Sequence, residues 1–183
     1  SESERAERLA RSQAVTALRA LARAVDAKDP STARHAERVA AISLRIAAEL
    51  GWTPERLEQL EEAALLHDVG KIGVPDALLF KADRLAPREM REVEAHAVLG
   101  AEIVSDVLSS EQVRWVRGHH ERWDGDGYPD GLAGEDISDG AAIIAVADSW
   151  DAMTSVRLYG TPKTFPEALA EARRCVEKQF SPA

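Results

Sequence analysis

The stretch TPERLEQLEEAALLHDVGKIG, residues 53–73, decides the fold of this chain. Pro54 follows a threonine, and proline is favoured at the first position of a helix. Three apolar residues and one histidine then recur three or four positions apart, so they share one helical face: Leu57, Leu60, Ala64 and His67. Gly70 predicts the end of this helix. The segment therefore predicts a helix that carries the pair His67-Asp68 at its C-terminal end.

Helical patterns also occur on both sides of this stretch. Further helices are predicted over residues 1–28, from a break at 29–32 to Gly51, over 87–108 with an interruption near His96, over 111–120, and from near 166 to 179. A short helix or turn is predicted over 75–83. Residues 121–141 are rich in glycine and aspartate and predict a loop.

Residues 141–147, AAIIAVA, fit two structures. Taken alone, this apolar run is typical of a buried strand. The sequence offers no second strand pattern to pair with it, so we expect a buried helix that reaches Ser155. The fold class that follows is an all-α helical bundle.

Length and composition limit the domain number, partners and location that this chain can have. A chain of 183 residues is most simply one domain with a single core. The net charge of −9 argues against DNA or RNA as a partner. One cysteine provides neither a disulfide framework nor a thiolate metal site, and we expect a cytoplasmic location. No apolar run approaches the roughly 18 residues of a membrane span, so we expect no membrane within this segment, although the full-length protein could be tethered to one.

The N-terminal residues 1–28 form the first predicted unit, and residues 29–183 form the second. The charged start SESERAER fits either a solvated helix start or a linker helix from an upstream regulatory domain. The chain begins without Met, and we expect a piece of a longer protein. Val15, Leu18 and Val25 recur at coiled-coil spacing and leave a homodimer open.

Every histidine of the chain enters one candidate metal set. Imidazole and carboxylate are ligands that first-row transition metals prefer. Any single histidine is more often an ordinary polar residue, but the full set exceeds what one ion needs and suggests two metals. The seven candidate ligands are His35, His67, Asp68, His96, His119, His120 and Asp148.

Three further residues have two interpretations each. Lys71 lies four residues after His67, where it either complements the helix dipole or holds a phosphate oxygen beside two metals. Asp151 and Glu121 are candidates for carboxylates that orient ligand histidines, and otherwise they are surface or capping acids.

Three motifs resemble those of the HD-GYP family, a branch of the HD phosphohydrolase superfamily. They are HDVGKI at 67–72, HHERWDGDGYP at 119–129, and ADSWDAMT at 147–154 followed by Arg157. The resemblance covers residues 20–180. It implies an all-α HD-domain bundle and a centre of two or three metals, usually iron or manganese. It also implies hydrolysis of cyclic di-GMP, a bacterial second messenger, to linear pGpG or on to GMP.

The family's site residues carry over by position. The resemblance implies one metal on His35, His67, Asp68 and Asp148, and another on His96, His119 and His120 with Asp68 shared. Lys71 matches the catalytic lysine, and Asp68 is the second residue that we expect to take part in catalysis. The expected substrate-binding residues are Gly127, Tyr128, Pro129 and Arg157.

Three positions depart from the family pattern. Ser31 replaces the usual tyrosine, and members with a third metal carry glutamate there, so we expect two metals. Ala142 and Gly160 stand where basic residues are common, which leaves more than one nucleotide substrate open. Two alternatives therefore accompany cyclic di-GMP hydrolysis: a hydrolase of another nucleotide, such as a different cyclic dinucleotide, and a non-catalytic module that binds the messenger or a partner protein.

Overall fold

The computed structural model describes residues 2–28, 34–156 and 161–182, and within them the all-α prediction is confirmed. No strand occurs among these residues, where one isolated β-bridge joins Val176 and Phe180. No helix in the described part of the chain combines the length and apolarity that crossing a membrane requires. In chain order the helices are α1 (Glu2–Lys28), α2 (His35–Glu49), α3 (Pro54–Leu66), η2 (Val69–Gly73), α4 (Asp76–Leu79), α5 (Pro87–Glu94), α6 (His96–Val104), α7 (Ser110–Gly118), η3 (Gly134–Asp136), α8 (Asp139–Thr154) and α9 (Phe165–Arg174).

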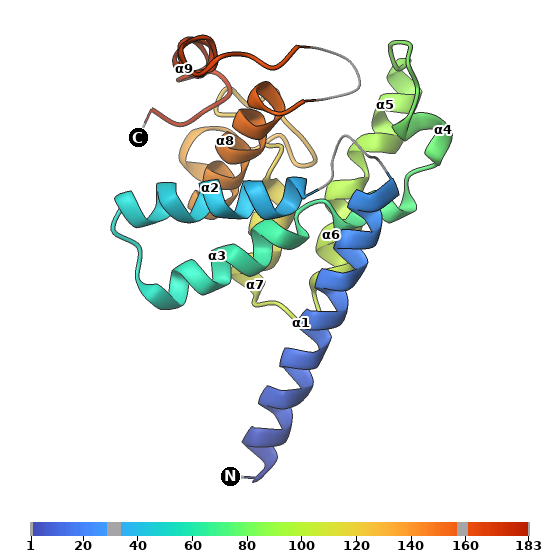
Figure 1. Cartoon of the computed structure of the whole chain (residues 1–183), viewed down its shortest axis with the longest axis vertical. Coiled ribbons are helices and arrows are strands. Elements are labelled where there is room, and N and C mark those ends of the chain that lie inside the picture. The colour runs from blue at the N-terminus through green and yellow to red at the C-terminus, as the bar shows by residue number, and fades with distance from the viewer. Residues whose placement is uncertain (1, 29–33, 157–160, 183) are drawn as a thin grey trace.

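Helix α1 is a long rod whose N-terminal part extends away from the other helices (Figure 1). Leu9 in that part is 60% exposed. The second half packs onto the body, where Val15, Ala22 and Val25 are buried. These side chains, which recur at a/d spacing, therefore attach α1 to the core. The division into units at residues 28 and 29 stays a prediction.

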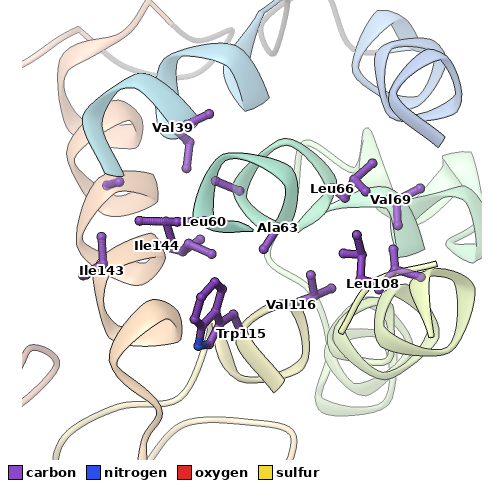
Figure 2. Close-up of a cluster of buried hydrophobic side chains, with 14 of the residues drawn as sticks. Val39, Leu60, Ala63, Leu66, Val69, Leu108, Trp115, Val116, Ile143 and Ile144 are labelled. Carbon is purple, nitrogen blue, oxygen red and sulfur yellow. The ribbon is translucent and has the colours of Figure 1, made fainter. Parts of the chain in front are cut away.

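The core is built around α3, which lies between α2, α7 and α8 (Figure 2). Full burial of one such apolar side chain contributes about 1.5–3 kcal/mol relative to exposure. Trp115 of α7 is the largest side chain here, and a Cβ on Gly140 would lie 2.4 Å from its ring. Glycine at that position lets α8 approach the indole. The buried cluster includes Val39, Leu60, Ala63, Leu66, Val69, Leu108, Trp115, Val116, Ile143 and Ile144.

A second close approach places the turn after α3 against α6. A Cβ on Gly70 would lie 2.0 Å from the carbonyl oxygen of His96 and 2.5 Å from the backbone nitrogen of Gly100. Only a residue without a side chain fits there. Because Gly70 lies two residues after Asp68, this contact brings the His67-Asp68 pair to the start of α6.

Three helix predictions need adjustment or lie outside the described residues. The interruption predicted near His96 within 87–108 is confirmed by the split at Ala95 into α5 and α6, but α6 ends at Val104 and not at Leu108. The last helix ends at Arg174, not near 179, because the following residues turn back and bridge Val176 to Phe180. The predicted break at 29–32 lies outside the described residues. The apolar run 141–147 lies within α8, so its helical interpretation is confirmed.

Candidate metal centre

Helix ends bring the predicted ligands together. His35 and His96 are the first residues of α2 and α6, whereas His67 and His119 directly follow the last residues of α3 and α7. Because these helix ends meet, the side chains at them converge on one point. Buried members of the set are His35, His67, Asp68, His96 and His119, and half-buried members are His120 and Asp148.

Asp68 stands in the middle of these histidines. Its Oδ2 lies 3.4 Å from Nε2 of His67 and 3.8 Å from Nε2 of His35. Its Oδ1 lies 3.4 Å from Nε2 of His96 and 3.8 Å from Nε2 of His119. The two oxygens of one carboxylate therefore face two different histidine pairs.

The centre thus has two sides that share Asp68. We call them the acidic side (His35, His67 and Asp148) and the imidazole side (His96, His119 and His120). In each group of possible ligands, His35/His67/Asp68 and Asp68/His96/His119/His120, the donor atoms lie within 4.8 Å of one another. Oδ1 of Asp148 lies 3.2 Å from Nε2 of His35.

Backbone carbonyls set the tautomer of three of the rings. Nδ1 of His67 donates to the carbonyl of Ala64 at 2.7 Å. His96 and His119 donate in the same way to the carbonyls three residues before them, both at 2.6 Å. A carbonyl only accepts, so Nδ1 carries the proton and Nε2 presents a lone pair to the centre.

The donor set fits a metal. Nε2 of His67 and Oδ1 of Asp68 are buried without a hydrogen-bond partner among the described residues. Buried polar atoms are normally satisfied, and unsatisfied nitrogen and oxygen atoms that converge on one point are typical of a site that binds a cation. The two unsatisfied atoms belong to His67 and Asp68, which are both members of the groups of possible metal ligands.

On the acidic side, carboxylates surround His35. Its Nδ1 lies 2.7 Å from Oδ2 of Asp151, and Asp151 also accepts hydrogen bonds from Arg38 at 2.5 and 3.0 Å and from Ser155 at 2.8 Å. Burial by itself lowers the pKa of His35, but hydrogen bonds with Asp148 and Asp151 raise it to about 9. Asp151 therefore contacts a candidate ligand histidine, as expected of an orienting carboxylate.

On the imidazole side, burial dominates. Burial, followed by the charge of the neighbouring His96, lowers the pKa of His120 to about 4. Burial and the adjacent imidazoles also lower the pKa of His119 well below its ordinary value. These rings are neutral at pH 7, which is the form that binds metals.

Lys71 forms an ion pair with Oδ2 of Asp68. Burial disfavours the charged form of Asp68, but the charges of Lys71 and His67 hold its pKa well below the ordinary value. The lysine lies at the edge of the centre with 30% of its side chain exposed, so it can reach a bound anion.

The loop after α7 places Tyr128 over the imidazole side. The ring centroids of Tyr128 and His120 lie 4.7 Å apart at an interplanar angle of 32°. Gly127 allows this turn, because a Cβ there would lie 2.4 Å from the backbone nitrogen of Arg122. The Tyr128–Pro129 peptide bond is cis. Burial, followed by the charge of Asp68, raises the pKa of Tyr128, so the phenol stays protonated.

The remaining sequence predictions have different outcomes. Arg157, Ser31 and Gly160 lie outside the described residues. Ala142 lies half-buried in α8. The prediction that Glu121 orients a ligand histidine is wrong. Its carboxylate instead accepts backbone N–H groups of Asp130 and Leu132, because the loop folds back over it.

Sequence reasoning missed two supports of the centre. Arg38 holds Asp151, and its position three residues after His35 on the same helix was a usable signal. The second support is the C-terminal segment, whose carbonyls at Lys178 and Gln179 accept from Asp124 and Trp123. No local pattern indicates that long-range contact.

Comparisons with known proteins agree with this architecture. The sequence model of the HD domain family matches residues 19–183. A cyclic di-GMP phosphodiesterase of Thermotoga maritima is 42% identical over 158 residues, which are 85% of this chain and 43% of that protein. The cyclic di-GMP phosphodiesterase response regulator RpfG of Xanthomonas campestris is 41% identical over 84% of this chain and 41% of its own length.

Other relatives differ in the substrate that they are named for. The 3′3′-cGAMP-specific phosphodiesterase 3 of Vibrio cholerae is 41% identical over 82% of this chain and 33% of its own length. The chain thus spans less than half the length of these relatives.

Two solved structures are similar. A cyclic GMP-AMP phosphodiesterase from V. cholerae, V-cGAP3, superposes with a TM-score of 0.71 over 92% of this chain and 46% of that one, at 18% identity, which shows the fold alone. Bd1817, described as an HDG"Y"P protein from Bdellovibrio bacteriovorus, gives a TM-score of 0.65 at 27% identity over 81% of this chain and 48% of that one.

Proposed function

Because the chain belongs to the HD domain family, and within it to the HD-GYP type, we propose that it is a metal-dependent phosphodiesterase that hydrolyses a cyclic dinucleotide. Cyclic di-GMP is the first candidate substrate, and linear pGpG or GMP is the product. The observation that carries this proposal is Asp68, whose two oxygens each face a pair of histidines.

The residues present would hold two divalent ions, and we propose iron or manganese. One ion would take His35, His67, Asp68 and Asp148, and the other would take Asp68, His96, His119 and His120. Such ions supply Lewis-acid polarisation of the phosphoryl oxygens and an activated water nucleophile. Their charge would also offset the acidic character of a chain whose net charge is −9.

The chain's own side chains would bind and orient the nucleotide. Lys71 would neutralise charge on a non-bridging phosphoryl oxygen, a role supported by its place beside Asp68. Tyr128 would stack on a base or ribose or donate its hydroxyl to a phosphate, with Gly127 and Pro129 shaping the turn. We assign substrate contact to Arg157 as well, on the family resemblance alone.

A second substrate has its own support. Some relatives of comparable similarity are named as 3′3′-cGAMP-specific phosphodiesterases. Ala142 stands where basic residues are common in the family, and this could change how the second nucleotide is held. Hydrolysis of a mixed cyclic dinucleotide is therefore the alternative substrate class.

The setting of the domain belongs to the same proposal. We place the reaction in the cytoplasm, with an upstream regulatory domain connected through α1 and with a homodimer left open. No DNA, RNA or membrane takes part in this segment. Size measurement on the purified chain tests the homodimer.

Activity measurement decides between these functions. The purified protein is loaded with Mn²⁺ or Fe²⁺, its metal content is determined, and cyclic di-GMP and 3′3′-cGAMP are each followed to linear product. We expect two ions per chain and cleavage that His67→Ala abolishes. Turnover of 3′3′-cGAMP alone would assign the second substrate class. Binding of either nucleotide without turnover would contradict the enzymatic proposal and leave a messenger-binding module.

A further inference from the structure

The loop that carries Tyr128 folds back onto the residue that begins it. Its backbone nitrogen at Tyr128 donates to the carbonyl of His120 at 3.3 Å. Gly127 lies on the same stretch, because a Cβ there would be 2.6 Å from Cα of Glu121. The tyrosine therefore reaches His120 only while the loop stays closed over Glu121.

Glu121 lies inside this closed loop. Glu121 is buried, with 3% of its surface exposed. Oε1 accepts the backbone N–H of Asp130 at 2.7 Å, and Oε2 accepts that of Leu132 at 2.9 Å. Each carboxylate oxygen thus accepts one backbone N–H group from the loop segment that directly follows the Tyr128-Pro129 pair. A buried carboxylate with two backbone donors is a strong, directional support.

Other contacts of the loop bind different positions, such as the backbone N–H of Gly134, which donates to the carbonyl of Trp123 at 3.0 Å. Arg117 and Asp130 form an ion pair at 2.7 Å, but both side chains are more than a third exposed. Solvent-exposed pairs contribute little. The backbone contacts of Trp123 and Asp124 with the C-terminal segment hold the opposite end of the loop. Glu121 alone among these contacts pairs with the backbone directly after Pro129.

We propose that Glu121 is a positioning residue that fixes Tyr128 over His120 and thereby sets the affinity for the cyclic dinucleotide. This inference rests on the proposed function, in which Tyr128 contacts the substrate. Both carboxylate oxygens of Glu121 accept backbone N–H groups of the loop, and Glu121 is not among the proposed metal ligands. Its loss should weaken substrate binding while the ions and the chemical step persist.

The kinetic test compares two identical substitutions in one loop. Glu121→Gln keeps one acceptor oxygen and turns an amide N–H₂ toward a backbone N–H, whereas Glu135→Gln changes an exposed carboxylate of the same loop. We expect Glu121→Gln to raise KM roughly tenfold, with kcat within about threefold and metal content unchanged. Glu135→Gln should match the wild type. A fall in kcat or metal content with KM unchanged would overturn the inference.

A double-mutant cycle asks whether Glu121 acts through the tyrosine. In the Tyr128→Ala background, Glu121→Gln should raise KM no further, because the ring that it positions is gone. Independent, multiplicative effects would overturn the inference. Should Glu121→Gln fail to fold, Glu121→Asp keeps both acceptors on a shorter side chain. It should then give a smaller rise in KM, and a KM equal to that of the wild type would overturn the inference.

Amide hydrogen exchange separates this inference from the proposed function. The backbone amides of Asp130 and Leu132 should exchange faster in Glu121→Gln than in the wild type and in Glu135→Gln, whether or not the protein is active. Unchanged exchange at both amides would overturn the positioning role even in an active enzyme. Absence of any nucleotide cleavage by the wild type, with faster exchange in the variant, would contradict the proposed function and leave Glu121's hold on the loop supported.

Discussion

The acidic side and the imidazole side of the centre both contain buried histidines, yet the histidines of the two sides have opposite charge preferences. The pKa of His35 is raised to about 9, and that of His120 is lowered to about 4. Burial favours the neutral ring in both. The difference comes from the neighbours, since His35 contacts Asp148 and Asp151, whereas His120 faces other imidazoles.

This contrast shows that burial alone does not set the protonation state of a candidate ligand histidine. The imidazole side offers neutral lone pairs at once, so it is ready for a cation. The acidic side holds a proton on His35 that a cation must displace. Asp68 belongs to both sides and joins them into one centre.

Removing the shared carboxylate should break both sides together and give the largest effect. We expect Asp68→Ala to lower the metal content on both sides and the rate of hydrolysis by more than about a thousandfold. Metal analysis and product formation measure the two losses. Asp106→Ala removes an exposed aspartate and serves as the control. Retention of two ions by Asp68→Ala would contradict its shared role.

Removing one histidine at a time should separate the sides. We expect His35→Ala and His120→Ala each to keep one ion and to lose at least about a hundredfold in rate. The remaining site should then show its own pH dependence. In His35→Ala, metal affinity should change little from pH about 6 to about 9, because the imidazole side has already lost its protons.

In His120→Ala the opposite trend is expected. The affinity of the acidic side should rise with pH until the pKa of His35, about 9, is passed, because the ring must release its proton to bind. Calorimetric metal titration at several pH values measures both trends. The same pH dependence in the two variants would contradict the electrostatic distinction between the sides.

A smaller effect should follow from changing the orientation of His35 without removing it. Asp151→Asn replaces the carboxylate oxygen that faces Nδ1 and removes the charge that Arg38 contacts. We expect metal affinity on the acidic side to fall by about tenfold to a hundredfold, with the imidazole side unaffected. Ser155→Ala, which removes only a donor to Asp151, should give a lesser change. Equal losses on both sides would show a general loss of structure.

The smallest effect is expected outside the centre, at the exposed pair Arg117–Asp130. Hydrogen bonds from Arg117 lower the pKa of Asp130 below its ordinary value of 3.8. The contribution of the Arg117–Asp130 pair to stability is therefore present above that value and lost as the pH falls through the lowered pKa of Asp130. Arg117→Gln should cost at most about 0.5 kcal/mol at neutral pH and nothing in strong acid. Thermal melting at both pH values measures this, and a larger cost would contradict the distinction between exposed and buried pairs.

The sequence predicts the helices and the candidate ligands because both follow local rules. Apolar periodicity marks α3, and the apolar run of α8 can be assigned because nothing pairs with it as a strand. Among the roles that sequence reasoning missed, those of Glu121 and of the C-terminal segment depend on chain reversal. Glu121 lies beside His120 in the sequence, yet its carboxylate faces residues nine and eleven positions later. The end of α9 at Arg174 likewise depends on where the C-terminal segment docks.

Gly70 shows how a residue without functional groups can limit changes to a reactive centre. Its α-carbon passes so close to α6 that a methyl group would overlap the carbonyl of His96. Any larger residue would push the turn that bears Asp68 away from the imidazoles opposite. The spacing between the two halves of the centre is therefore governed by the size of a neighbour that binds nothing, and this neighbour should tolerate replacement less well than many of the polar residues around it.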